Sequence, residues 1–218
     1  MTVATLLVVK QPPVYQQFVP LPSDERVRIA WPTQNHTLFD APETFFARTR
    51  VNPDYGKPGF TRDCGKRFHR GCDIAPVSVT PTDRTTRVMF TDCTTGQDFE
   101  SEEPTFVPHD DVFCVCSGTV REIAEDENTS DFGQHVVVVH AWPRSTAKFF
   151  TLYAHLAEII VTPHASLTVG QRIGWMGQTS RSADARNWMA IAPHLHFEVR
   201  DAQGGSYDPV EFLRAYLR

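Results

Sequence analysis

The sequence has few of the features that mark a nucleic-acid-binding, membrane-spanning or disordered protein. Its 218 residues hold 21 Lys and Arg against 26 Asp and Glu, so the formal net charge is −5, and no run of basic residues suggests a nucleic-acid partner. No apolar stretch approaches the roughly 18 residues that cross a membrane. Apolar residues make up 41% of the chain and charged residues 22%, which favours a packed core over disorder. The length fits one large domain, or one domain with a substantial extra segment.

The N-terminus also lacks the marks of a signal peptide. The short apolar run at residues 3–9 has no basic region before it and no small-residue cleavage site after it. We expect this run to form a first strand. An intracellular location, export by another route and loss of a leader all stay open at this point.

Cysteine is scarce, and its spacing argues against a thiolate zinc site. The five cysteines include no CxxC pair, and their odd number prevents complete pairing. We expect them to serve mainly as small buried packing residues, with room for one disulfide that the sequence does not assign. They are Cys64, Cys72, Cys93, Cys114 and Cys116.

Proline separates the first 60 residues from the rest of the chain. Each proline removes an amide donor and fixes φ, so long regular elements are not expected there. We predict an irregular segment over residues 1–60 that packs on a main domain of residues 61–218. It would contain one short helix near residues 41–49, with Asp40 as N-cap and Pro42 in the first turn. The aromatic side chains expected to make the contact are Phe18, Trp31, Phe39, Phe45 and Phe46.

From about residue 61 the pattern changes to short β-strands. Apolar runs and alternating patterns predict strands at 112–125 with a break at Ser117-Gly118, and at 135–142, 147–156, 172–179 and 192–200. Because strands dominate and helical periods are few, the expected fold class is α+β, β-rich, with an antiparallel sheet.

Helices and insertions are limited to three places. A brief helical turn is expected after His155. A C-terminal helix begins where Asp208 can cap it and Pro209 fills its first position. Residues 77–111 are polar and become acidic toward their end, which predicts a loop insertion with a small hairpin around Thr95-Gly96.

Histidine and aspartate residues occur in a pattern typical of metal ligands. His194 and His196 alternate with apolar residues and so share one face of a predicted strand. His69 and Asp73 flank Gly71, whose backbone freedom would allow both side chains to converge. Zinc prefers such N and O ligands in a tetrahedron, and two His with one Asp leave a fourth position open for water. Each motif alone is more often a surface pair, but their joint presence favours a metal site.

Six segments, in order, resemble the M23 metallopeptidases of the lysostaphin and LytM type. They are HRGCD at 69–73, SGTV at 117–120, GQHVVVVH at 133–140, LYAHL at 152–156, VGQRIGWMGQTSRS at 169–182 and PHLHFEVR at 193–200. The family pattern is HxGxD, later YxHL, then a glycine-rich segment and PHLHFE. The resemblance implies a β-rich peptidase domain with an open groove over an antiparallel sheet.

The resemblance also implies roles for five residues. His69, Asp73 and His196 would bind Zn²⁺, while His155 and His194 would be catalytic histidines that are not ligands. One of these two would take a proton from the zinc-bound water and the other would orient the water or stabilise the oxyanion. We favour His194 as the base and His155 as its partner, and the sequence leaves the division of roles between them open. The implied substrate is the peptide part of peptidoglycan, either stem or cross-bridge, and the implied location is the cell envelope or the exterior.

Several positions depart from the family pattern. Phe68 lacks the hydroxyl of a tyrosine that many members carry shortly before HxGxD, and Cys72 stands where an apolar residue is common. The links at 77–111 and 182–192 are longer, and we expect them to lie beside the groove and to affect specificity. We expect Glu198 to support the site from behind the ligands. A polar side chain from residues 34–36, or Asn52, could make the protein latent by reaching the zinc.

Two other functions stay open. A metal-binding protein with this fold could regulate another cell-wall hydrolase, although the complete set of five residues counts against it. A metallopeptidase could instead cut a protein substrate, with the longer links reshaping its groove. A divalent ion other than zinc also suits these ligands, since N and O donors accept several first-row metals.

Overall fold

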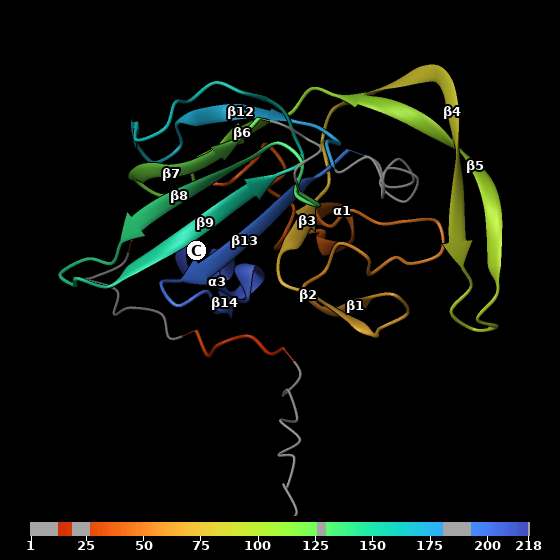
Figure 1. Ribbon diagram of the computed structural model, residues 1–218, viewed down its shortest axis with the longest axis horizontal. Helices are drawn as coiled ribbons and strands as arrows, with labels where there is room; N and C mark the ends of the chain where they lie inside the picture. Colours follow the sequence, from red (N-terminus) through yellow and green to blue (C-terminus); the bar gives the residue numbers. More distant parts are fainter. Residues whose placement is uncertain (1–12, 19–26, 126–129, 181–192, 218) are drawn as a thin grey trace, which may run out of the picture.

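The computed structural model describes residues 13–18, 27–125, 130–180 and 193–217, and an antiparallel sheet of seven strands forms its centre. The strands lie in the order β11-β7-β8-β9-β13-β14, and β3 pairs with β13. Figure 1 shows β7, β8, β9 and β13 side by side. Their bounds are β3 (Cys72–Ile74), β7 (Gly118–Ala124), β8 (His135–Ala141), β9 (Lys148–Ala154), β11 (Ser166–Leu167), β13 (Leu195–Asp201) and β14 (Ser206–Tyr207). The predicted β-rich fold class is confirmed.

Along strand β13, apolar side chains face the main hydrophobic core and polar side chains face the other side of the sheet. Leu195, Phe197 and Val199 are fully buried in the core, as their alternation predicts, while His196 and Glu198 point to the opposite face. Helix α3 (Pro209–Tyr216) adds Phe212 and Leu213, among others, to the same core. The side chain of Asp208 accepts hydrogen bonds from the backbone N–H groups of Val210 and Glu211, so the predicted cap is confirmed.

A smaller antiparallel sheet consists of β10 (Leu156–Ile159), β12 (Arg172–Met176) and β6 (Asp111–Phe113). The helical turn expected after His155 is wrong, because these residues extend and pair with β12. Leu156 lies opposite Met176, and both side chains are buried. His155 itself has a φ of 63°, in the left-handed region, at the junction between β9 and β10.

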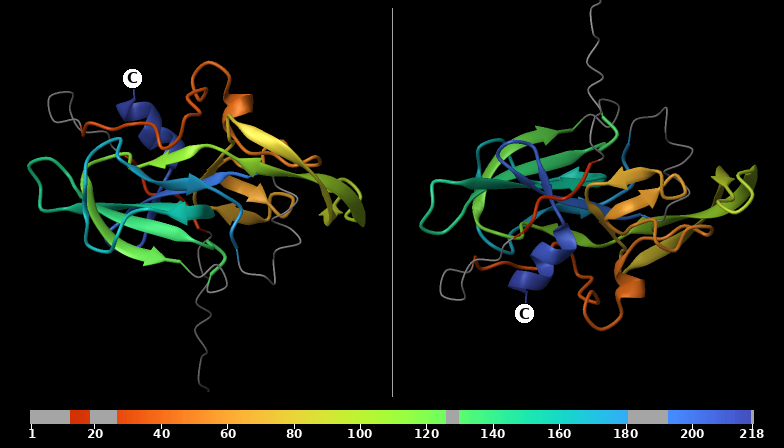
Figure 2. Two further views of the ribbon diagram at one scale, coloured as in Figure 1. Left: turned by 90° about the horizontal axis from the view of Figure 1, so that it is seen from above. Right: turned by 90° about the horizontal axis from the view of Figure 1, so that it is seen from below.

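Two hairpins complete the strand set. The first joins β1 (Gly59–Arg62) to β2 (Arg67–His69). The second joins β4 (Val79–Thr91) to β5 (Asp98–Pro108) and projects beyond the central sheet (Figure 1, Figure 2). Residues 77–111 are therefore mostly paired strands rather than a loop; the hairpin expected around Thr95-Gly96 is confirmed, but its strands are much longer than expected. Gly96 lies in the turn with a φ of 72°.

The described parts of the N-terminal segment pack against the core. Helix α1 (Pro42–Phe45) is shorter than expected, and Ala41 takes the N-cap position in place of Asp40. The helix ends because Phe46 is extended, buried and bridged to Ile74 of β3. The division of the chain at residue 60 stays a prediction, and the strand expected at residues 3–9 lies outside the described residues.

The cysteines behave as the sequence predicts. Cys64 and Cys93 form a disulfide between the turns of the two hairpins, and Cys72, Cys114 and Cys116 are buried and free. Among the described helices, none is long and apolar enough to cross a membrane.

Candidate metal centre and active site

Three strands bring His69, Asp73 and His196 together. His69 ends β2, Asp73 is the middle residue of β3, and His196 lies opposite Asp73 in the β3–β13 pair. Nδ1 of His196 is 2.9 Å from Oδ1 of Asp73 and 3.2 Å from Nε2 of His69, and that Nε2 is 3.2 Å from the same carboxylate oxygen. All three side chains are buried. Residues separated by more than 120 positions thus converge on one small volume.

The spacing of these donor atoms fits a single metal ion. Ligands about 2.0–2.2 Å from a tetrahedral zinc lie roughly 3.3–3.6 Å from one another. The observed separations of 2.9–3.2 Å are slightly shorter, so only a small expansion would admit the ion. Two imidazoles and one carboxylate form a donor set that zinc accepts.

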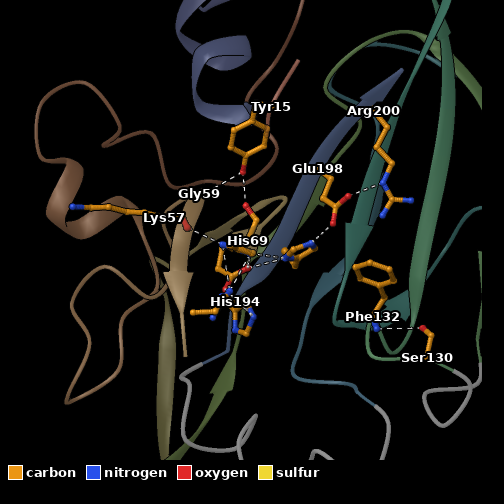
Figure 3. A network of polar contacts seen from close by, with 12 residues as sticks. Tyr15, Lys57, Gly59, His69, Ser130, Phe132, His194, Glu198 and Arg200 are labelled. Atoms are coloured by element: carbon orange, nitrogen blue, oxygen red, sulfur yellow. Dashed lines mark hydrogen bonds and ion pairs between the residues drawn. The ribbon is translucent and has the colours of Figure 1, made fainter. Parts of the chain in front are cut away.

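Hydrogen bonds fix the ring of each candidate ligand histidine. Nδ1–H of His69 donates to the backbone carbonyl of Lys57 at 2.8 Å, which leaves Nε2 as the metal-facing nitrogen. Nε2–H of His196 donates to Oε1 of Glu198 at 2.8 Å, which leaves Nδ1 on the metal side. Glu198 in turn accepts from Nε of Arg200 at 2.6 Å, and Figure 3 shows these contacts. Glu198 therefore lies behind His196, where the sequence placed it.

The charges around the three donors favour ionised carboxylates. Burial alone would raise the pKa of Asp73, but the positive charge of Arg62 and the adjacent histidines hold it well below its usual range. Burial also opposes ionisation of Glu198, yet its contacts with His196 and Arg200 lower the pKa to about 2. In the metal-free protein, burial lowers the pKa of His196, but the hydrogen bonds and negative charges of Asp73 and Glu198 raise it by more. The pKa of His196 is therefore raised to about 9. Binding a metal would require His196 to lose this proton.

His155 and His194 lie beside the three candidate ligands. The rings of His155 and His194 meet edge to face with their centres 4.9 Å apart, and the ring of His155 is 5.8 Å from that of His196. Nε2 of His194 is 3.8 Å from Oδ2 of Asp73. The structure therefore gathers all five residues that the motifs single out. Their roles as ligands and catalysts stay predictions.

The environment of His155 keeps its ring neutral. Burial and the neighbouring His194 and His196 lower its pKa well below the usual range. Nδ1–H donates to the carbonyl of Thr179 at 2.8 Å, so Nε2 is the proton-accepting nitrogen. A neutral imidazole with a fixed tautomer can act as a general base.

Gly71 serves the site for a different reason than the sequence suggested. Its φ does not lie in the left-handed region, so backbone freedom is not what the position requires. A Cβ added here would come within 2.6 Å of Cε1 of His196 and 2.7 Å of the Phe197 carbonyl oxygen. The glycine is needed because β13 and the His196 ring pass directly against it.

Three further residues that no sequence motif indicates border the site: Arg62, Tyr15 and Phe132. Arg62 forms an ion pair with Asp73. The Tyr15 hydroxyl donates to the His69 carbonyl and accepts from Gly59 N–H at 3.2 Å. The ring of Phe132 is 5.5 Å from that of His196. No motif signals these residues, because each reaches the site through tertiary contacts.

The residues considered for latency are engaged elsewhere. The Asn35 amide donates to the carbonyls of Thr44 and Ala75, and Asn52 donates to that of Thr61. Gln34 donates to Asp111, and His36 stacks on Trp31. None of these contacts involves the candidate ligands. The longer link at 182–192 lies outside the described residues.

A cavity of about 220 Å³ opens beside the candidate ligands. His69, His155 and His196 line it on the side of the metal site, and Phe132 and Tyr55 contribute aromatic walls. A substrate in this cavity would lie against the donors and the neutral His155 at once.

Comparison with protein-family models identifies the chain. The model of peptidase family M23 matches residues 93–209, just over half of the sequence, and the chain belongs to this family. The match includes His155, His194 and His196, whereas His69 and Asp73 precede it. It follows that the chain is a member of a family of peptidases.

Two solved structures are among those to which the chain is similar. The catalytic domain of the antimicrobial peptidase lysostaphin from Staphylococcus simulans is 21% identical, and the match covers 73% of this chain and 90% of that one with a TM-score of 0.44. The catalytic domain of the prophage-encoded M23 protein EnpA from Enterococcus faecalis is 17% identical, with coverages of 70% and 85% and a TM-score of 0.40. A search of curated proteins found no match.

Proposed function

We propose that the protein is a zinc-dependent endopeptidase that hydrolyses peptide bonds in the stem or cross-bridge peptides of peptidoglycan. The observation that supports this most directly is the convergence of Nε2 of His69, Asp73 and Nδ1 of His196, with donor atoms 2.9–3.2 Å apart. The hydrogen bonds to Lys57 and Glu198 direct Nε2 of His69 and, once His196 has lost its extra proton, Nδ1 of His196 toward the metal position. Membership of a peptidase family provides the reaction class.

The residues of the site divide the work as follows. A zinc ion held by His69, Asp73 and His196 would supply a Lewis acid and lower the pKa of a bound water toward ~7. One of the two adjacent histidines, with His194 favoured, would take the proton from the nucleophile and return it to the leaving amine, while the other would orient the water or stabilise the oxyanion. His155 accepts at Nε2, since its Nδ1–H is held by Thr179. Glu198, which accepts from Nε2–H of His196, would keep Nδ1 of that ring directed at a bound metal.

The site would act in the cell envelope or outside the cell, where peptidoglycan is available. The disulfide between Cys64 and Cys93 supports this location, because such bonds persist in oxidising compartments. The proposed substrate follows from the family resemblance, and the proposal includes peptide bonds of either the stem or the cross-bridge.

The test is mass spectrometry of soluble fragments released from purified peptidoglycan by the zinc-loaded protein. We expect muropeptides cut at a peptide bond, lost in His194→Ala, which leaves the three candidate ligands in place. His196→Ala should lose both zinc and activity. Release of fragments by His194→Ala would contradict the assigned role of this histidine. A folded, zinc-containing protein that releases nothing would favour a regulator of another hydrolase, and cleavage of a glycine-rich protein alone would favour a protein substrate.

A further inference from the structure

Arg62 reaches into the candidate metal site from the end of β1. Its side chain is 4% exposed, and Nη2 lies 3.0 Å from Nε2 of His69 and forms an ion pair with Oδ2 of Asp73. His69 and Asp73 are two of the three residues that a metal ion would join. The guanidinium nitrogen thus lies where a cation is expected.

An irregularity in β1 explains why Arg62 points inward. Phe60 pairs with Phe68 and Arg62 pairs with Arg67, so Thr61 is an extra residue on this strand. A bulge of this kind reverses the alternation of side chains. Phe60 is 47% exposed, whereas Arg62 turns to the buried side and lies over the ring of Tyr55 at 3.5 Å.

The contacts of Arg62 are not those of a fully satisfied structural arginine. Nη1 is buried and has no hydrogen-bond partner among the described residues. Nη2 contacts a histidine nitrogen whose lone pair is available, because Nδ1 of that ring donates to Lys57. A buried N–H group without a hydrogen-bond partner lowers the stability of the folded protein, so these contacts argue against a purely structural role for Arg62.

We propose that Arg62 takes the place of the metal ion in the metal-free protein and must leave the site when the ion binds. This inference rests on the proposed metal site. The buried carboxylate of Asp73 needs a positive partner, and the guanidinium supplies it until a divalent cation arrives. The two cations cannot share the site, because like charges a few ångströms apart repel strongly and the Nη2–H group blocks the His69 lone pair. The adjoining cavity, which Arg62 already lines, can receive the displaced side chain.

The proposal predicts opposite effects on two measured quantities. Without Arg62, the buried Asp73 of the metal-free protein loses its ion pair with the guanidinium and keeps only its histidine contacts, so the protein becomes less stable. The same change removes the competitor, so zinc binds more tightly. An arginine that only supported the local structure would, when removed, weaken both stability and zinc binding.

The experiment compares Arg62→Met with Arg67→Met in the full chain. Arg67 lies opposite Arg62 on β2 and pairs with the exposed Asp63, so it matches Arg62 in charge and location but not in contact with the candidate ligands. Zinc affinity is measured by competition with a chromophoric chelator, and thermal unfolding is followed with zinc and with excess chelator. We expect Arg62→Met to bind zinc about tenfold more tightly or better, and to lose thermal stability only without zinc. Arg67→Met should match the wild type in both assays.

Each result decides between the alternatives. Unchanged or weaker zinc binding in Arg62→Met overturns the proposal, and so does an equal gain in Arg67→Met. If Arg62→Met folds only with zinc, Arg62→Gln is used, and tighter zinc binding than in the wild type by chelator competition is the expected result; equal or weaker binding overturns the proposal. If neither the wild type nor the Arg62 variants bind zinc, and His196→Ala changes nothing, the metal site itself is refuted and this inference falls with it.

Discussion

Replacing Gly71 by alanine tests whether close packing at this residue shapes the candidate metal centre. The new Cβ would lie 2.6 Å from Cε1 of His196 and 2.7 Å from the carbonyl oxygen of Phe197, whereas ordinary contacts begin at 3.4 Å. The ring cannot simply retreat, because its Nε2 is held by Glu198 at 2.8 Å. The carbonyl belongs to β13, which pairs with β3 and β9 on either side at this residue.

The size of the effect follows from two opposing contributions. Overpacking of this kind costs about 1–3 kcal/mol. Alanine also lowers the conformational entropy of the unfolded chain, which stabilises the folded protein by only about 0.4–1 kcal/mol. We therefore expect a net loss of roughly 1–2 kcal/mol in the free energy of unfolding. Because the ring that moves carries a candidate ligand nitrogen, zinc affinity should fall about tenfold or more.

Urea unfolding and chelator competition measure the two quantities. The control is the same substitution in a His196→Ala background, where the ring contact is gone and only the Phe197 carbonyl remains. The stability loss should be smaller there, and the difference reports the contact between residue 71 and the ring. A Gly71→Ala protein with wild-type stability and zinc affinity would refute the reasoning.

Two further predictions concern the stability of the fold. Burial lowers the pKa of His140 to about 4, against an opposing contact with the Ser117 carbonyl, so the unfolded chain takes up the proton first. The free energy of unfolding should therefore fall by about 3 kcal/mol as the pH falls from 6.5 toward 4. The pH profile of unfolding of His140→Gln should lack this loss. The disulfide between Cys64 and Cys93 spans 29 residues, so replacing both by serine should cost about 3–4 kcal/mol in urea unfolding, and no loss would contradict the loop-entropy estimate.

Features that repeat along one strand were predictable from the sequence. In β13 the apolar residues alternate with His196 and Glu198 because one face contacts the core and the other does not. The Asp208 cap was predictable for a similar reason, since its hydrogen bonds join residues two and three positions apart. In both cases the chemistry depends on near neighbours in the chain.

Features that depend on pairing between distant residues were not predictable. Residues 77–111 looked like a polar loop because the exposed sides of β4 and β5 carry Thr, Asp and Glu. Helix α1 stops early because Phe46 is drawn into the core beside Ile74, 28 positions further along. The gathering of the five motif residues could be inferred from the family pattern, whereas their spacing alone allowed only a weaker inference.

Arg62 shows most clearly where inference from sequence stops. Strict alternation along β1 would place it on the same side as the exposed Phe60, so the sequence suggests a solvated surface arginine between Thr61 and Asp63. Two facts reverse this expectation, and both are tertiary. The bulge turns the side chain inward, and the buried charge of Asp73 makes that burial favourable. A charged residue in direct contact with two candidate ligands therefore has no motif, because its position depends on a strand register and a partner that only the folded protein supplies.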